Sequence, residues 1–441
     1  MRRTVVVGAG LTGLSAAYHL AQRGITAPVL EKAHEAGGAC RTSCKEGFHF
    51  DLTGHLLHLA RPESEALLDA LGVRAGLRTH RRRAGVALAG TVTPYPIQIN
   101  TFRLPREVRR DCLLGFVEAR LNDAEPRPVT EGGPPGAEPS TSFADWVLTR
   151  FGAGFAYHFF FPYNRKLYGV DPGELTTEWV GRYVPRPETA DVIDGALGLY
   201  RGTAGYNATF LYPRRGGIRL LADALAATVP TLRLSTAVRE LRLGAREIVL
   251  DDGETTGWDA LVATMPLTDL VAITVDATSE MRAAASRLRA VGVVNLNLGV
   301  RGRAPRREHW LYVPEERYPF YRVGIPSNHG DLAPPGCHTL SVEVSVPVGG
   351  PAADDLVDRC LGGLEDLGLL RARSDVLAVE VARLDPAYVI FDREHRLAVA
   401  ELRDAYRAAG VVLAGRWAEW KYSTMEDALW DGAAVARRMP A

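Results

Sequence analysis

The stretch that decides the fold is TVVVGAGLTGLSAAYHLAQRGITAPVLE, residues 4–31. Its β-branched beginning, residues 4–8, predicts a short buried strand of the kind found in parallel sheets. The apolar spacing over 11–23 predicts a helix that Gly24 ends, and residues 27–31 predict a second strand. A glycine-rich turn between a strand and a helix is the context in which GxGxxG indicates a dinucleotide-binding Rossmann unit.

The three glycines of this turn each meet a different requirement of a bound pyrophosphate. Gly8 allows the tight turn, Gly10 lets the phosphates approach the backbone, and Gly13 lets the helix pack closely on the strand. The helix N-terminus adds unpaired amides that attract an anion. Glu31 follows Gly8 by 23 residues and is expected to bind ribose hydroxyls. Its carboxylate argues against NADP at this site, because it would repel a 2′-phosphate.

Composition limits the other classes of protein. The 441 residues predict two or three domains, and the balance of 52 basic and 52 acidic side chains predicts no nucleic-acid partner. The five cysteines include no CxxC pair, so no metal site is expected. No apolar run reaches the ~18 residues of a membrane span, and no signal peptide is recognised, which together predict a cytoplasmic enzyme without a membrane partner.

The rest of the chain predicts a discontinuous architecture. Helices are expected near 105–121 and 142–151, on either side of a Pro- and Gly-rich loop at 125–139, and a last helix is expected at 424–439. Strands are expected at 231–251, directly before Pro266, at 292–300, at 338–347 and at 410–416. The strands at 292–300 and 338–347 alternate as in an antiparallel sheet. Strands from both ends therefore flank a large middle, which must supply the substrate side of a Rossmann domain.

A second glycine motif indicates which dinucleotide binds. EKAHEAGGACRT, residues 31–42, carries Gly37, Gly38 and Arg41 just beyond the ribose acid. This GG-x-x-R-T pattern resembles the second fingerprint of the amine-oxidase-like flavoproteins, in which it continues the pyrophosphate cradle. GVVLAGR (410–416) resembles their closing motif, where a strand end and a helix N-terminus meet the flavin. The resemblance implies FAD.

Six further motifs resemble those of the UDP-galactopyranose mutase family, and they are nearest to its larger, eukaryotic-type members. They follow the family's order, and the resemblance runs from about residue 4 to 435. They are FDLTGHLLH (50–58), TPYPIQIN (93–100), FFPYNRKLYGV (160–170), YNATFLYPRRGG (206–217), HWLYVPEERYPFYRV (309–323) and AGRWAEWKY (414–422).

The resemblance implies an α/β fold: a Rossmann-type FAD-binding domain with an inserted helical region and an antiparallel sheet domain. The discontinuous FAD domain is expected to comprise residues 1–80, 205–265 and 395–441. Residues 81–204 are expected to form a mainly helical domain on the substrate and nucleotide side. Residues 266–394 are expected to form the antiparallel sheet domain.

The reaction of that family has no net redox change. Reduced flavin attacks the anomeric carbon of a nucleoside diphosphate sugar, the diphosphate leaves, and the sugar recloses between its pyranose and furanose forms. A leaving diphosphate requires cations and hydroxyl donors. NADPH or NADH is expected only as a transient reductant, because the sequence has no second GxGxxG fingerprint for a nicotinamide dinucleotide.

Matching the motifs position by position implies the site residues. The catalytic set is His55, Arg322, Tyr422 and Asn207, with Arg322 as the phosphate clamp and His55 beside the isoalloxazine. The cofactor set is Gly8, Gly10, Thr12, Gly13, Glu31, Lys32, Gly38, Arg41, Gly54, His55, Gly415, Arg416 and Met425. The substrate set is Tyr95, Gln98, Asn164, Arg182, Asn207, Tyr312, Arg322, Tyr388 and Tyr422, with Tyr95 and Gln98 on the uridine side.

The sequence departs from the family pattern in three places. Thr53 stands where a glycine is usual, and Ile97 replaces an aromatic residue that often stacks on the base. The loop that carries a second diphosphate arginine reads WVGRYVPRP here, with Tyr183 at the aligned position. Arg182 and Arg186 are therefore both candidates for the second clamp.

Two other functions remain open at this stage. One is an oxidoreductase of the amine-oxidase or protoporphyrinogen-oxidase kind, which shares the cofactor motifs. The other is a non-catalytic flavin-bound partner protein. The PYN, NATF, PFYR and WKY motifs favour the mutase, because an oxidase of an apolar substrate has no need for phosphate-binding residues.

Overall fold

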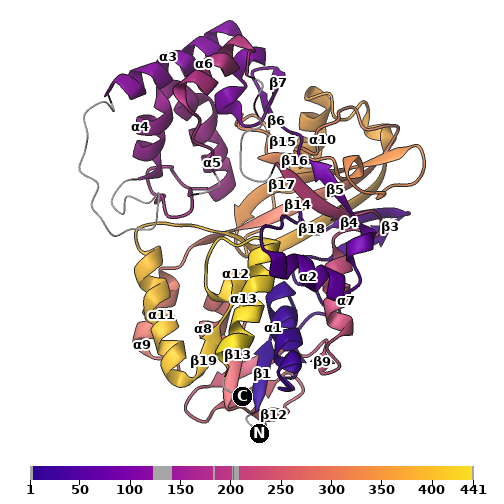
Figure 1. The fold of residues 1–441 in the computed structure, drawn as a ribbon, viewed down its shortest axis with the longest axis vertical. Helices are drawn as coiled ribbons and strands as arrows, with labels where there is room; N and C mark the ends of the chain where they lie inside the picture. Colours follow the sequence, from indigo (N-terminus) through magenta and orange to yellow (C-terminus); the bar gives the residue numbers. More distant parts are fainter. Residues whose placement is uncertain (1–2, 123–141, 182–183, 201, 203–207, 440–441) are drawn as a thin grey trace.

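Figure 1 shows the fold in a computed structural model, which describes residues 3–122, 142–181, 184–200, 202 and 208–439. The expected loop at 125–139 and the candidate residues Arg182 and Asn207 lie outside these described residues. Within them, no helix is both long and apolar enough to cross a membrane.

A five-stranded parallel sheet holds the chain's first and last segments together. Its order is β19-β13-β1-β2-β9, with β1 at Thr4–Val7, β2 at Val29–Leu30, β9 at Leu232–Arg233, β13 at Ala260–Ala263 and β19 at Val411–Leu413. The strand expected at 27–31 is thus confirmed but shorter, and Pro28, just before it, has no N–H to donate to a neighbouring strand. Strands from both ends of the chain do share one Rossmann sheet.

Helices cover both faces of this sheet. On one side, α1 (Leu11–Gln22) packs beside α13 (Met425–Arg438), as Figure 1 shows, and α7 (Arg219–Ala227) joins them. On the other side lie α8 (Leu267–Ile273), α9 (Ser279–Ser286) and α11 (His395–Ala409). Alternate residues of β1 serve the two layers: Val6 belongs to the first core, and Val5 and Val7 belong to the second.

A seven-stranded sheet lies above the parallel sheet, toward the right in Figure 1, in the order β18-β14-β17-β16-β15-β6-β7. Its strands are β6 (Ala84–Leu88), β7 (Thr91–Pro94), β14 (Ala290–Arg301), β15 (Trp310–Tyr312), β16 (Arg322–Gly324), β17 (Cys337–Pro347) and β18 (Val376–Val389). The pairing is antiparallel except between β15 and β6, which run parallel. Helix α10 (Leu356–Asp366) packs on one face of the sheet.

The expected helical region is α3 (Arg106–Asn122), α4 (Phe143–Phe155), a π-helical turn at Ala156–Phe160, α5 (Phe161–Tyr168) and α6 (Thr189–Leu197). Helices α3 and α4 touch backbone to backbone. A Cβ on Gly152 would lie 1.9 Å from the carbonyl oxygen of Gly115, so only glycine allows this contact. Gly152 also has φ +76°, which kinks α4 at the crossing.

Smaller elements join these layers. They are the hairpin β3 (Thr42–Lys45) and β4 (Phe48–Asp51), the pair β5 (Leu77–Arg81) and β8 (Thr209–Pro213), the three-stranded sheet β10 (Val238–Arg242), β11 (Glu247–Leu250) and β12 (Thr255–Gly257), and the helices α2 (Pro62–Ala70) and α12 (Gly415–Ala418). The loop that follows β4 contacts the seven-stranded sheet, because the Gly54 amide donates to Glu343 of β17. That contact is where the candidate site lies.

Candidate functional site

The first glycine turn is closed by contacts that only glycine permits. Gly8 has φ +101°, and a Cβ there would lie 2.4 Å from Thr264 Oγ1. A Cβ on Gly13 would lie 1.9 Å from the Gly8 carbonyl oxygen. Gly10 precedes α1 and offers no side-chain cap, so the first amides of that helix stay available for an anion.

The second glycine motif docks directly on the first. Gly10 and Gly37 form a parallel bridge, and the Gly37 amide donates to the Ala9 carbonyl at 2.8 Å. Arg41 Nε donates to the Gly38 carbonyl at 2.7 Å, and one Nη lies 3.4 Å from Glu35. The guanidinium is therefore held beside the turn, where it can face a phosphate.

Glu31 is fixed at the end of β2 by backbone donors. Its carboxylate accepts from the Ala9 amide at 2.8 Å and from the Ala33 amide at 2.9 Å. Each carboxylate oxygen has a further lone pair, so ribose hydroxyls can still donate to it. Lys32, assigned with it to the cofactor set, has an exposed side chain.

The closing motif packs against the same turn. Gly415 has φ +83°, and a Cβ there would lie 2.4 Å from Thr12 Oγ1. Met425 is the first residue of α13, where a capping box between Thr424 and Asp427 satisfies two backbone amides. The Met425 amide is one of the leading amides without an intrahelical partner. These contacts bring the expected cofactor residues from both ends of the chain together.

Arg416 connects this cradle to the substrate side. Its two Nη atoms donate to the Ser423 and Ala387 carbonyls at 3.0 and 2.8 Å. Its guanidinium lies 5.1 and 5.4 Å from the ring centres of Tyr422 and Tyr388. The buried Nε has no hydrogen-bond partner among the described residues, which leaves a donor for a bound group.

His55 is neutral at pH 7. Burial lowers the pKa of its imidazole to about 4, outweighing the opposing effect of the Thr53 carbonyl. The Nδ1 lies 3.0 Å from that carbonyl and therefore carries the proton. Nε2 is left as an acceptor. The residue can thus orient a hydrogen-bond donor. No group of three or more side chains that could bind a metal ion occurs in the described ranges.

Arg322 and Glu343 form an ion pair beside the Gly54 loop, in which Glu343 is buried and the side chain of Arg322 is 22% exposed. Arg322 Nη2 lies 2.6 Å from Glu343 Oε1, and the strand register pairs the two residues across β16 and β17. The carboxylate also accepts from Tyr321 Oη at 2.5 Å and from the Gly54 amide at 3.1 Å. Burial alone would raise the pKa of Glu343, but Arg322 and these donors lower it. Only one nitrogen of the guanidinium is used among the described residues, so other donors remain.

Aromatic side chains line the space beside this pair. The ring centres of Tyr95 and Tyr312 are 4.8 Å apart, and that of Tyr163 is 5.4 Å from Tyr312. Tyr321 continues the line to Tyr388, at 6.3 Å. Tyr163 and Tyr321 also contact each other, at 6.3 Å, so three of the four tyrosines expected on the substrate side belong to one row of rings.

Two amides expected on the substrate side are buried with spare acceptors. Gln98 Nε2 donates to the Pro185 carbonyl at 3.3 Å, whereas its Oε1 is buried without a partner among the described residues. Asn164 Nδ2 donates to the Phe160 carbonyl at 2.8 Å, within its own helical segment. Both side chains are thereby oriented, which is the condition for selective recognition of a ligand.

The two candidates for a second clamp differ. Arg186 has an exposed side chain, and its guanidinium lies 5.3 Å from the ring centre of Trp146. Arg182 lies outside the described residues, as does Asn207. Glu343 and Tyr163 were not predicted as site residues. The sequence signal for Glu343 was a single carboxylate inside the apolar strand HTLSVEVSV, since a buried charge on a strand requires a partner.

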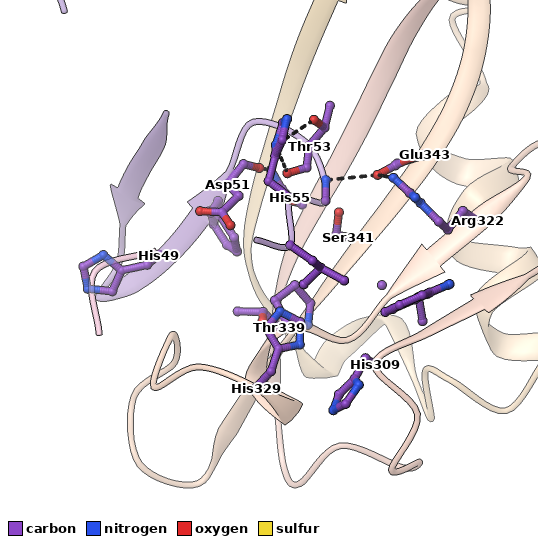
Figure 2. A pocket seen from close by; sticks show the side chains of 17 residues that line it. His49, Asp51, Thr53, His55, His309, Arg322, His329, Thr339, Ser341 and Glu343 are labelled. Carbon is purple, nitrogen blue, oxygen red and sulfur yellow. Dashed lines mark hydrogen bonds and ion pairs between the residues drawn. The ribbon is translucent and has the colours of Figure 1, made fainter. Parts of the chain in front are cut away.

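A cavity of about 70 Å³ opens beside Gly54, between the loop after β4 and the seven-stranded sheet. Figure 2 shows Arg322 and Glu343 together near one end of it, and His309 and His329 near the other. The site is therefore hollow on this side of the ion pair.

Comparisons with known proteins agree with this geometry. The crystal structure of a reduced UDP-galactopyranose mutase is 26% identical, with a TM-score of 0.90 over 99% of this chain and 95% of that one. A redesigned putrescine oxidase is 15% identical with a TM-score of 0.65, which is a likeness of fold alone.

Sequence relatives are mostly oxidases. A coproporphyrinogen III oxidase of Mycobacterium leprae (strain TN) is 28% identical over 65% of this chain and 64% of its own length. Protoporphyrinogen oxidase 2 of Arabidopsis thaliana is 41% identical, but over 17% of this chain and 14% of its own. The chain thus spans less than two thirds of either relative. The sequence profile of the flavin-containing amine oxidoreductases matches residues 11–440. The chain belongs to the flavin-containing amine oxidoreductase family.

Proposed function

We propose that the protein is a flavin-dependent mutase that interconverts the pyranose and furanose forms of a UDP-galactose-like nucleotide sugar. One observation carries this proposal: the half-buried Arg322, held by the buried Glu343, stands among tyrosines next to the Gly54–His55 loop. A cation and hydroxyl donors in one enclosed space suit a diphosphate that leaves and returns.

The cofactor in this proposal is FAD. The two docked glycine turns, the fixed Glu31 and the unpartnered Arg416 Nε fit an adenine dinucleotide that extends toward Tyr388 and Tyr422. FAD supplies the nucleophile when it is bound and reduced. His55 offers a neutral acceptor at Nε2, which fits the N–H of a reduced flavin better than the lone pair of an oxidised one.

The protein's own residues would bind and polarise the diphosphate. Arg322 offers the donors that Glu343 leaves unused, and its charge is permanent because its pKa lies well above the usual value, where Glu343 outweighs burial. The hydroxyls of Tyr95 and Tyr388 make no hydrogen bond to a described residue, so they are available to a ligand. The Gln98 Oε1 is the matching acceptor for a nucleobase N–H.

The alternative is an oxidoreductase. The observation that favours it is that the sequence relatives include porphyrinogen oxidases. A half-buried arginine with open donors is a poor wall for an apolar substrate, because each unmet donor costs about 1–3 kcal/mol. A diphosphate accepts from those donors, whereas a substrate without acidic groups does not.

The deciding experiment incubates the FAD-loaded protein with UDP-galactose under anaerobic conditions, with dithionite or NADPH and without either, and resolves the nucleotide sugars by chromatography. The proposal expects UDP-galactofuranose only when the flavin is reduced. A parallel aerobic incubation tests the alternative: consumption of oxygen in proportion to a substrate there, with no isomer formed in either incubation, would refute the proposal in favour of the oxidoreductase.

A further inference from the structure

Helix α5 carries a lysine that contacts three backbone carbonyls of another segment. Lys166 Nζ donates to the carbonyl oxygens of Val313 at 2.8 Å, Glu315 at 2.9 Å and Phe320 at 2.5 Å. An ammonium group has three N–H donors and no acceptor, so these three carbonyls saturate it. The Lys166 side chain loses most of its conformational freedom in this arrangement, and it forms three charge-assisted hydrogen bonds.

All three carbonyls belong to the loop that joins β15 to β16. The loop starts directly after Tyr312 and ends directly before Arg322. Its ends are also tied by the Val313 amide, which donates to the Tyr321 carbonyl at 2.8 Å. Lys166 therefore fixes the part of the chain that delivers both a tyrosine and the arginine clamp.

The same helix also delivers residues of the site. Asn164 lies two positions before Lys166, and the ring of Tyr163 packs edge-on against Tyr312 at 5.4 Å. Helix α5 and the β15–β16 hairpin are thus in direct contact. The ammonium of Lys166 is a half-buried charged contact between them.

We propose that Lys166 is a positioning residue, which holds Tyr312 and Arg322 in register with Asn164 for diphosphate binding. This inference rests on the proposed function. Lys166 itself does not touch the substrate in this account, because all its donors are used by the loop.

The protonation state of Lys166 matters to this role. Burial lowers the pKa of its amine to about 7, against the opposing charges of Glu315 and Glu316 on the loop. A neutral amine has two N–H donors and leaves one carbonyl without a partner. The hold on the loop is therefore complete in the ammonium form and weakens as the pH rises above 7.

Arg165 provides a matched control. It is the neighbouring residue on α5, it is exposed, and its guanidinium lies 3.5 Å from Glu316 of the same loop and 3.1 Å from Asp171. Arg165→Met removes the same charge from the helix and a contact with the same loop, but it leaves the three carbonyls bonded. A general loss of loop stability would affect both variants alike.

The test compares FAD-loaded wild type, Lys166→Met, Lys166→Arg and Arg165→Met. UDP affinity is measured by calorimetry, and KM and kcat are measured for UDP-galactose with reduced flavin. For Lys166→Met we expect the UDP Kd and the KM to rise about tenfold, which is the effect of losing one hydrogen bond to a charged group. The value of kcat should stay within about threefold of wild type, and the FAD content should be unchanged. Lys166→Arg should recover part of the affinity, and Arg165→Met should stay within about twofold of wild type.

The outcomes separate the inference from the function it rests on. If wild type converts UDP-galactose but Lys166→Met and Arg165→Met have equal Kd values for UDP, the inference is overturned and the proposed function stands. If Lys166→Met does not fold, the pH dependence of UDP affinity in Lys166→Arg decides. Arginine stays charged, so the affinity of this variant should not follow the fall that wild type shows between pH 6 and 8.5. An equal fall in both proteins overturns the inference. A wild type that neither binds UDP nor converts UDP-galactose overturns both.

Discussion

Removing the charge of Glu343 is the perturbation that most directly probes how the site is built. Glu343→Gln keeps the volume of a side chain that is 2% exposed, but an amide cannot accept from Arg322, Tyr321 and Gly54 together. Its NH2 group must face one of those donors. Arg322 is then a half-buried charge without its counter-ion.

The expected cost follows from these contacts. Breaking a buried ion pair by neutralising one partner costs about 3 kcal/mol or more, because the remaining charge stays desolvated. We expect Glu343→Gln to lower the free energy of unfolding by about that amount near pH 7. It should also release FAD at a lower temperature, because the Gly54 amide that leads into His55 loses its anchor.

The assay is denaturant unfolding of the FAD-loaded protein, followed by flavin and tryptophan fluorescence, at several pH values. The pKa of Glu343 is lowered from its usual value of 4.5, so its contribution is complete above pH 4.5 and is lost as the pH falls through the lowered value. Wild type and Glu343→Gln should therefore differ by a constant amount from about pH 5 upward and converge in acid. A difference below about 0.5 kcal/mol at pH 7 would refute the buried pair as a support of the site.

Three further predictions concern the cofactor and the clamp. Arg322→Ala should lower kcat/KM for UDP-galactose about a hundredfold while the purified protein stays yellow; loss of flavin with unchanged turnover per bound flavin would show that Arg322 is misassigned. Gly13→Ala should yield protein without FAD, since its methyl group would sit 1.9 Å from the Gly8 carbonyl, and a normal flavin spectrum would contradict this packing. His55 should show no titration by NMR between pH 6 and 9, because its pKa lies near 4, and an imidazole signal that shifts near pH 6.5 would contradict its burial.

The sequence predicted the elements whose patterns are local. Strand β1 is a run of buried valines, helix α1 follows a glycine turn, and α13 begins at the Thr424 cap, so each could be recognised within a dozen residues. Strand β18 was not predicted, because Val376–Val389 is half-exposed and interrupted by charged residues and a proline. Its place in the sheet follows from pairing with β14, which is a long-range contact.

The residues of the candidate site show the same difference between local and long-range signals. Arg322 could be predicted because its motif is contiguous, whereas Glu343 could not, since it meets Arg322 only through the register of β16 on β17. The role of Lys166 was likewise hidden, because its three partners are main-chain carbonyls about 150 residues away and carry no side-chain signature. Residue types can be read from a motif, but their partners depend on the fold.

The central claim is that the bond between the sugar and the diphosphate breaks and re-forms without net oxidation. It is tested most directly with UDP-galactose that carries ¹⁸O in the oxygen bridging the anomeric carbon and the β-phosphorus. We predict that the FAD-reduced protein moves the label into the non-bridging positions, seen by ³¹P NMR, as the furanose isomer appears, and that the oxidised protein does neither. A label that stays in the bridge while substrate is consumed with oxygen would contradict the account.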